Sequence, residues 1–298
     1  MRFKRFALIL SLFVFAFSAC TVSKQMKQLD TEAQQRYNEA SYAEAFDLYG
    51  EIISIKTQQG KEVETTVYQN AGIAAWHVGK FTDAINYLEK VKERSSTNAQ
   101  TYYYIAKAYL KVDNLSREIT NLEEFTKIYA DKEEITEVNH QLFMAYVRSE
   151  NWDKAYTQWP LLSSNQQEEV LTIEAYIKVT RQLGYTDKLL PIASKLLKSD
   201  SKNVLALEVL AMYYYNLGED SYQVEMKAYE KNRTNKQYKQ LLEALKVINE
   251  NFKISRDYFE RLYKLKPEPK FANYLGNIYT RFDNKSQANY YYRKAKQN

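Results

Sequence analysis

The side chains best suited to acid–base chemistry or metal binding are scattered along this chain of 298 residues. Its two histidines, His77 and His140, lie far apart and lack the paired-histidine spacing of a helical metal site. The paired carboxylates Glu123-Glu124, Glu133-Glu134 and Glu168-Glu169 are adjacent, so on a helix they point to different sides. We find no Gly-rich phosphate loop and no nucleophile elbow. We therefore expect no enzyme, no metal site and no cofactor.

Tyrosine is the most conspicuous side chain, with 27 copies against 13 of phenylalanine. Three triplets, at 102–104, 213–215 and 290–292, resemble platforms for a cofactor or a glycan. On a helix, however, three successive residues point in three directions, toward the core, the neighbouring helix and the surface. We therefore interpret most of the tyrosines as packing residues.

The first twenty residues have the features of a targeting signal. Arg2, Lys4 and Arg5 precede an apolar stretch over 6–19 that is too short to span a bilayer and is typical of a secretory signal. The stretch ends Phe17-Ser18-Ala19-Cys20, which resembles the lipobox of bacterial lipoproteins, where the chain is cut before a lipid-modified cysteine. Cys20 is the only cysteine in the chain. Cleavage after Ser18, with Cys20 as an incidental thiol, is the alternative.

The resemblance implies three parts: a removed signal peptide over 1–19, a lipidated tether over 20–29 and a folded domain over 30–298. It also implies a lipid anchor in the bacterial outer membrane. No acidic run follows Cys20, and this favours the face toward the periplasm. The whole chain carries a net charge of +5, but the removed segment holds three of the basic residues, which leaves +2. Neither charge nor compartment favours a nucleic-acid partner.

One supersecondary unit is repeated along the rest of the chain. Tyr274-Leu275-Gly276-Asn277-Ile278-Tyr279, followed by Ala288 and Tyr292, closely resembles the tetratricopeptide repeat (TPR). The small position of the second helix returns every 32 to 37 residues, against a family period of about 34. The resemblance implies an all-α, right-handed superhelical solenoid of about eight TPR helix-turn-helix units. The series of small positions is Ala45, Ala84, Glu118, Ala155, Leu189, Gln223, Ser255 and Ala288.

Turns and breaks refine this prediction. We expect turns between paired helices where Gly or Asn can cap a helix, at Gly79, Asn114, Asn151, Gly184 and Asn251. The step from Ala45 to Ala84 is longer, which indicates an insertion near 58–64. Pro160 and Pro191 fall in predicted second helices, where we expect a kink or a shortened helix. The unit around Gln223 has the least certain register.

The resemblance also implies where a partner would bind. In TPR proteins the first helices line a concave groove, and the corresponding positions here are basic and aromatic. Such a groove favours an acidic or carboxylate-ended segment with apolar anchors. The alternative is that these cations only keep an exposed face soluble. The implied groove residues are Trp76, His77, Tyr103, Lys107, Leu110, Lys111, Met144, Arg148, Lys178, Arg181, Tyr215 and Arg281.

Two functions follow. The first is a non-enzymatic scaffold, a TPR lipoprotein that holds a protein partner in an envelope assembly or secretion complex. The second is a glycan-binding helical lipoprotein that uses exposed aromatic platforms, supported only by Trp76, Trp152, Trp159 and the tyrosine triplets. The sequence leaves the partner and the oligomeric state open.

Overall fold

Every regular element in the described part of the protein is a helix. The computed structural model describes residues 24–296, the side chain of Asp187 excepted. The predicted all-α class is confirmed. No helix in this range is both long enough and apolar enough to cross a membrane. Cys20 and the predicted signal lie outside the described residues.

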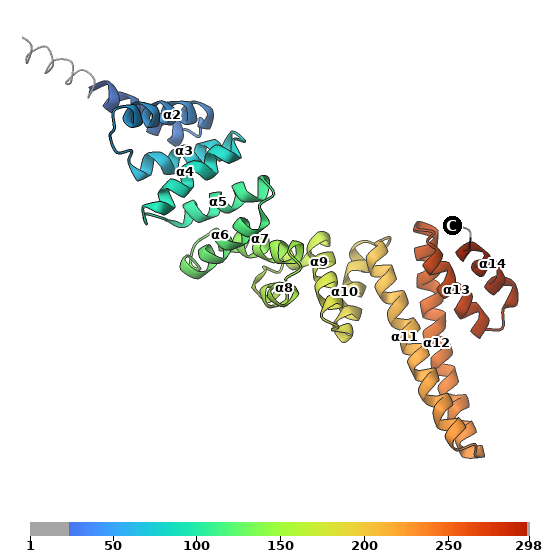
Figure 1. Ribbon diagram of the computed structural model, residues 1–298. Helices are drawn as coiled ribbons and strands as arrows, with labels where there is room; N and C mark the ends of the chain where they lie inside the picture. The colour runs from blue at the N-terminus through green and yellow to red at the C-terminus, as the bar shows by residue number, and fades with distance from the viewer. Residues whose placement is uncertain (1–23, 297–298) are drawn as a thin grey trace, which may run out of the picture. The chain divides into compact units, whose positions relative to one another are not determined.

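The chain divides at Glu150 and Asn151 into two compact units (Figure 1). The first unit contains a helix over 24–38, then α2 (Tyr42–Gln58), α3 (Thr65–His77), α4 (Phe81–Glu93), α5 (Ala99–Lys111), α6 (Leu115–Ile128) and α7 (Ile135–Arg148). The second unit contains α8 (Trp152–Gln158), short 3-10 turns at Trp159–Leu161 and Gln166–Glu168, α9 (Val170–Gln182), α10 (Thr186–Ser199), α11 (Val204–Lys231), α12 (Asn235–Leu265), α13 (Pro269–Arg281) and α14 (Lys285–Ala295).

Turns within the helix pairs follow one pattern. Each contains a residue in the left-handed backbone region, seven positions after a residue of the first helix that is Ala or Gly in four of the six pairs. The predicted turns at Gly79 and Gly184 are confirmed, with φ of 79° and 75°. At the predicted Asn114 turn, Asp113 is left-handed and the Asn114 side chain caps α6. The left-handed turn residues are Ala40, Gly79, Asp113, Glu150, Gly184 and Asp283.

The pair α11 and α12 departs from this pattern, and the predicted turn at Asn251 is wrong. Gly218 stands seven residues after Ala211, yet α11 continues through it to Lys231. The segment 219–231 holds no Gly, Pro or Asn that would stop a helix. The chain reverses only before Thr234, whose side chain caps α12 by accepting from the Gln237 N–H. Two predicted units therefore form one long hairpin (Figure 1), and the described residues make seven helix pairs along the chain, not eight.

The predicted irregularities have mixed outcomes. The insertion near 58–64 is confirmed as the loop between α2 and α3. Pro160 lies in a 3-10 turn directly after α8, which is only seven residues long, so the predicted shortening is confirmed. Of the kink or shortening predicted at Pro191, the shortening is wrong, because α10 is 14 residues long and continues from Pro191 to Ser199. Pro191 lies in the second turn of α10, where the helix loses one backbone bond near its start.

Paired helices approach closely where the first helix has a glycine. A β-carbon at Gly72 would lie 2.6 Å from Leu88, and one at Gly276 would lie 2.5 Å from Tyr292. Both large side chains come four residues after the small position of the second helix. A small residue on one helix and a large one on its partner therefore hold the pairs together, as the repeat pattern predicts.

Candidate functional site

In the first unit, the first helices of successive pairs are joined by an aromatic and polar cluster. Tyr104 OH lies 3.3 Å from His77 Nε2, which links α3 to α5. Lys107 Nζ lies 3.1 Å from Glu137 Oε1, which links α5 to α7. The cluster gathers several of the predicted groove residues on adjacent helices. It consists of Tyr42, Trp76, His77, Tyr103, Tyr104, Lys107 and Glu137.

Lys107 lies in this cluster with its charge already compensated. Its Nζ donates to Tyr103 OH at 3.0 Å and to Glu137, and lies 4.7 Å from the centre of the Trp76 ring. The buried Tyr103 donates its hydroxyl to the other Glu137 oxygen. Burial acts to raise the pKa of Glu137, but the bonds from Tyr103 and Lys107 outweigh it and hold that pKa below its ordinary value. An incoming acidic segment would have to displace Glu137.

Arg148 is also paired. Its guanidinium lies 2.6 Å from Oε1 of Glu118, a buried carboxylate on α6. The second oxygen, Oε2, is buried and has no hydrogen-bond partner among the described residues. Burial raises the pKa of Glu118, and the pairing with Arg148 only partly offsets this. Arg148 therefore acts first as the counter-ion of a carboxylate that stands at a small position of the repeat.

The remaining predicted residues of the first unit differ in surroundings. The His77 ring stacks on Tyr42 with centroids 3.8 Å apart, and partial burial followed by the charge of Lys107 lowers the pKa of His77. Met144 is half-buried, whereas Lys111 is exposed and makes no ion pair with a described side chain. The predicted set in this unit thus contains one uncompensated cation, Lys111.

The second unit contains a hollow of about 420 Å³ between the end of α9, the start of α10 and the middle of α11. Arg181 stands at its edge and makes no ion pair with a described side chain. The other charged groups there are Glu208, which pairs with Lys270 at 2.9 Å, and Asp220. The apolar lining consists of Leu189, Val209, Met212, Tyr213 and Leu217.

Lys178 lies three residues before Arg181, on the same side of α9. Its Nζ lies 5.1 Å from the centre of the Trp152 ring and forms no ion pair with a described carboxylate. Leu171, two turns further back along this side, is 71% exposed. The α9 surface beside the hollow thus combines two cations with an exposed apolar side chain. We call the hollow and this α9 surface the α9–α11 groove.

Tyr215 and Arg281, the last two predicted groove residues, are engaged within the second unit. Tyr215 packs against Phe252 and Tyr274, and its hydroxyl accepts a bond from Asn277 at 3.4 Å. Arg281 pairs with Glu219 and lies 4.8 Å from the centre of the Phe252 ring. Both residues tie α13 to the long hairpin.

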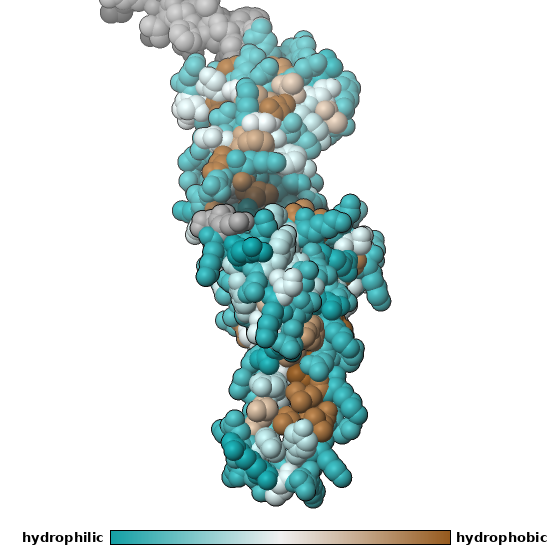
Figure 2. All heavy atoms as spheres, turned by 90° about the vertical axis from the view of Figure 1, so that its right-hand side faces the viewer, coloured by the Kyte–Doolittle hydropathy of each residue, from teal (hydrophilic) through white to brown (hydrophobic). Residues whose placement is uncertain are grey.

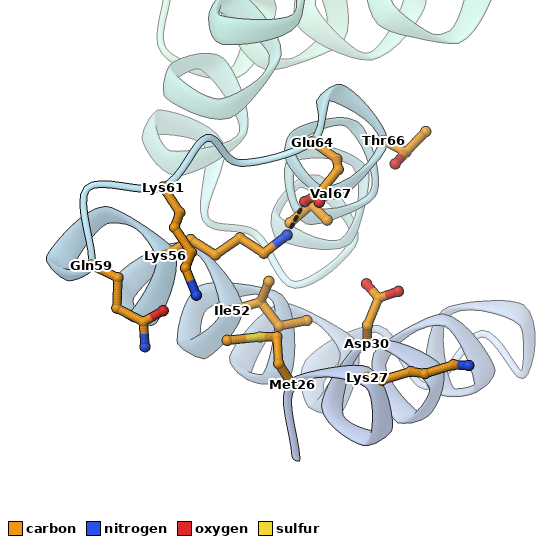
Figure 3. A pocket seen from close by; sticks show the side chains of 10 residues that line it. All are labelled: Met26, Lys27, Asp30, Ile52, Lys56, Gln59, Lys61, Glu64, Thr66 and Val67. Carbon is orange, nitrogen blue, oxygen red and sulfur yellow. Dashed lines mark hydrogen bonds and ion pairs between the residues drawn. The ribbon is translucent and has the colours of Figure 1, made fainter. Parts of the chain in front are cut away.

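A second hollow, of about 360 Å³, lies between the helix over 24–38, α2 and the loop before α3. Figure 3 shows Met26 beside Ile52, and Lys56 bonded to Glu64. The hydrogen bond from Lys56 lowers the pKa of Glu64. Of the charged residues that line this hollow, Lys56 and Glu64 compensate each other.

Exposed aromatic platforms are not observed at the three tryptophans. Trp159 stacks on Tyr176 with centroids 3.9 Å apart, Trp152 lies under Lys178, and Trp76 contacts Tyr104. Among the described residues, no group of three or more His, Cys, Asp or Glu side chains could hold a metal ion.

The sequence interpretation missed the carboxylates that neutralise its cations. Glu137 follows Tyr103 by 34 residues, one repeat period, so its place beside Tyr103 was implicit in the period. Glu219 faces Arg281 across 62 residues, a separation that the long hairpin creates and no regular period indicates. The apolar lining residues Met212 and Leu217 were also missed.

No protein-family model matches the chain, and no curated protein matches it. Among solved structures, the chain is similar to the C-terminal part of a TPR repeat-containing protein from Cytophaga hutchinsonii, with 12% identity, a TM-score of 0.51, and coverage of 89% of this chain and 93% of that one. A tetratricopeptide repeat protein from Parabacteroides merdae shares 11% identity, with a TM-score of 0.45 over 91% and 92%. A Bacteroides ovatus protein described as protein-binding shares 18%, with 0.46 over 62% and 98%. The Cytophaga likeness shows the fold, a TPR-type helical repeat.

Proposed function

We propose that this TPR-type protein is a non-enzymatic scaffold that binds a protein partner through the α9–α11 groove. The observation that carries the proposal is the combination of a hollow with five apolar lining residues and two cations, Lys178 and Arg181, that form no ion pair with a described carboxylate. In the first unit, by contrast, Lys107 and Arg148 are already paired. The partner segment we propose is acidic or carboxylate-ended and has apolar anchors.

The chemistry of the groove supports this partner class. Apolar side chains of a bound segment would enter between Leu189, Met212 and Leu217, where they lose contact with water. Carboxylates on the same segment would meet Lys178 and Arg181, which gives orientation and speeds association. A short helical or extended segment could bind in such a groove.

A photo-crosslinking amino acid at Met212 tests the groove in living cells. We expect it to capture one envelope protein, and the double reversal Lys178→Glu, Arg181→Glu to lower the yield at least about fivefold by repulsion. The matched control is the double reversal Lys198→Glu, Lys202→Glu, at exposed positions outside the groove lining. An equal loss in the control, or no captured protein, would refute the groove proposal.

We further propose that Cys20 carries the lipid and that the protein resides at the periplasmic face of the outer membrane, in an assembly or secretion complex. Cys20→Ala should abolish metabolic labelling with a fatty acid and release the protein from the membrane fraction. Protease added to intact cells should leave the protein uncut. Cleavage in intact cells would show that the protein lies at the outer face of the outer membrane instead.

A further inference from the structure

The long hairpin extends past the place where its neighbours turn. Gly218 and Asn251 correspond to the two turn residues that are adjacent in an ordinary pair, such as Asp113 and Asn114. Here 32 residues lie between them. Helix α11 is therefore longer by 13 residues and α12 by 16, or roughly 20 Å and 24 Å. We call 219–231 and 235–250 the arms of the hairpin (Figure 1).

The arms have little support from the rest of the second unit. From 219 to 250, only Leu241 and Ile248 are buried. Helices in proteins owe most of their stability to the packing of an apolar face, and two helices alone bury only one side of each. The arms nevertheless present large apolar side chains to water, including Val224 and Val247, which are 65% and 66% exposed.

Contacts within the hairpin fix which residues stand level. Ser255 Oγ donates to the carbonyl oxygen of Ala211 at 2.8 Å, and the ring centroids of Tyr229 and Tyr238 lie 5.8 Å apart. In this register, Val224 stands level with residues 242–243, about one helical turn from Val247. Leu217 and Ile254, both exposed, lie seven residues closer to the base on their own helices and have the same offset.

All four of these residues lie on one face of the hairpin. Leu217, Val247 and Ile254 each come one residue before a position that faces the other helix, namely Gly218, Ile248 and Ser255. In antiparallel helices, such residues flank the same side of the contact. Figure 2 shows apolar side chains gathered on the hairpin. We call Val224, Val247 and Ile254 the hairpin patch; Leu217, which also lines the α9–α11 groove, lies at its edge.

The surroundings of the hairpin patch favour a second identical surface over a charged partner. Ser221, Ala228 and Asn251 continue the same stripes without charge. On α12, the charges near the patch form pairs within the helix, Lys246 with Glu243 and Lys253 with Glu250. Two copies of such a face would meet without repulsion between like charges.

The size of the face is also sufficient. A strip roughly 27 Å long and 20 Å wide, two helices across, would bury about 1,000 Å² in two copies, which is the lower limit for a specific interface. A twofold axis perpendicular to this face, midway between Val224 and Val247, would place Val224 of each copy beside Val247 of the other. That arrangement gathers four valines, two from each copy, at the centre of a four-helix bundle.

We propose that the hairpin patch binds the same patch of a second copy of this chain, so that two hairpins form a four-helix bundle. The test is sedimentation of the full chain, purified in detergent, over a range of concentrations. The wild type should sediment as a dimer, and Val247→Lys should weaken the dimer at least about tenfold, because two buried ammonium groups would face each other. Val224→Lys should act alike. A wild type that stays monomeric at about 0.1 mM overturns the proposal.

The matched control lies on the same helix. Leu242 is 42% exposed and stands about 140° around α12 from Val247, so Leu242→Lys should leave the dimer intact. An equal loss in Leu242→Lys would refute the assigned face. Because all three substituted residues are exposed, circular dichroism melts should confirm unchanged folding. The Lys178→Glu, Arg181→Glu variant should remain dimeric, which separates this proposal from the proposed partner groove.

Cysteine pairing gives a second, geometric test. Two differently tagged full chains, one with Val224→Cys and one with Val247→Cys, should form a mixed disulfide dimer under mild oxidation in cells. A chain with Leu242→Cys in place of Val247→Cys should not. If the first experiment yields only monomers, the proposed contact between Val224 and Val247 of two copies is wrong.

Discussion

The ring of Phe252 lies against the backbone of Gly218, so closely that a β-carbon there would come within 3.1 Å of two ring atoms. Phe252 is fully buried and also contacts Tyr215. This contact lies at the point where neighbouring pairs turn, and it lets two long helices continue side by side. A larger side chain at Gly218 would overlap the Phe252 ring and disturb the packing of the two long helices.

We predict that Gly218→Leu destabilises the protein by about 2 kcal/mol, because the new side chain overlaps the buried Phe252 ring. The control is Gly50, a glycine inside α2 where an added β-carbon would have nothing within 4 Å. Gly50→Ala should stabilise by about 0.5–1 kcal/mol, since alanine has the higher helix propensity. Chemical denaturation measures both. Equal effects at the two sites would contradict the assigned contact.

We predict that deleting 219–250 leaves a folded solenoid. The deletion joins Gly218 to Asn251, so that asparagine follows a turn residue as it does at Asp113-Asn114, and the shortened pair should turn at Gly218. The melting temperature should stay within about 3 °C of that of the Val247→Lys variant. This variant is the reference because it lacks any stability that a dimer would add. Deleting 215–246, a segment of equal length that contains Tyr215 and Gly218, should lower it by about 10 °C or more. Equal melting temperatures would contradict the repeat register.

The repeat architecture was predictable because it is a periodic property. Small residues such as Ala84 and Ala288, and glycines such as Gly79, recur at the spacing that two packed helices require. The hairpin was not predictable from the period, because Gln223 fits the spacing of a small position and Asn251 fits the spacing of a turn. Helix α11 continues past Gly218 because 219–231 holds no Gly, Pro or Asn that would stop it, and the packing of Phe252 against Gly218 joins the two long helices.

The electrostatic character of the groove was harder to predict than its position. The repeat places Lys107 and Arg148 on first helices, but whether their charge is free depends on carboxylates from neighbouring helices. Glu137 and Glu118 compensate them, whereas Lys178 and Arg181 have no such partner among the described residues. Charge in a solenoid groove is thus a property of adjacent repeats taken together.

We predict that Lys107→Met raises the pKa of His77. Partial burial and the positive charge of Lys107 both lower this pKa, and the substitution removes the second cause. Titration of the His77 ring protons by NMR measures the shift. Lys111→Met, one turn further along α5 and without a described ion pair, should shift His77 less. A larger shift in the Lys111 variant would contradict the assigned geometry.

We predict that the cost of removing Arg148 depends on pH. Burial raises the pKa of Glu118, so protonation of the folded state is favoured and the stability of the protein from this group falls as pH rises through that pKa. Arg148 limits this loss, since its guanidinium lies 2.6 Å from the ionised carboxylate.

At neutral pH, Arg148→Ala should destabilise by about 2 kcal/mol, less than for a fully buried pair because the Arg148 side chain is 40% exposed. As pH falls toward the ordinary glutamate range, Glu118 becomes protonated in both proteins and the difference should shrink. Arg148→Lys, which keeps the charge, should lose less at neutral pH. Urea denaturation of the three proteins at several pH values measures this, and a difference that stays constant with pH would show that Arg148 stabilises by packing alone.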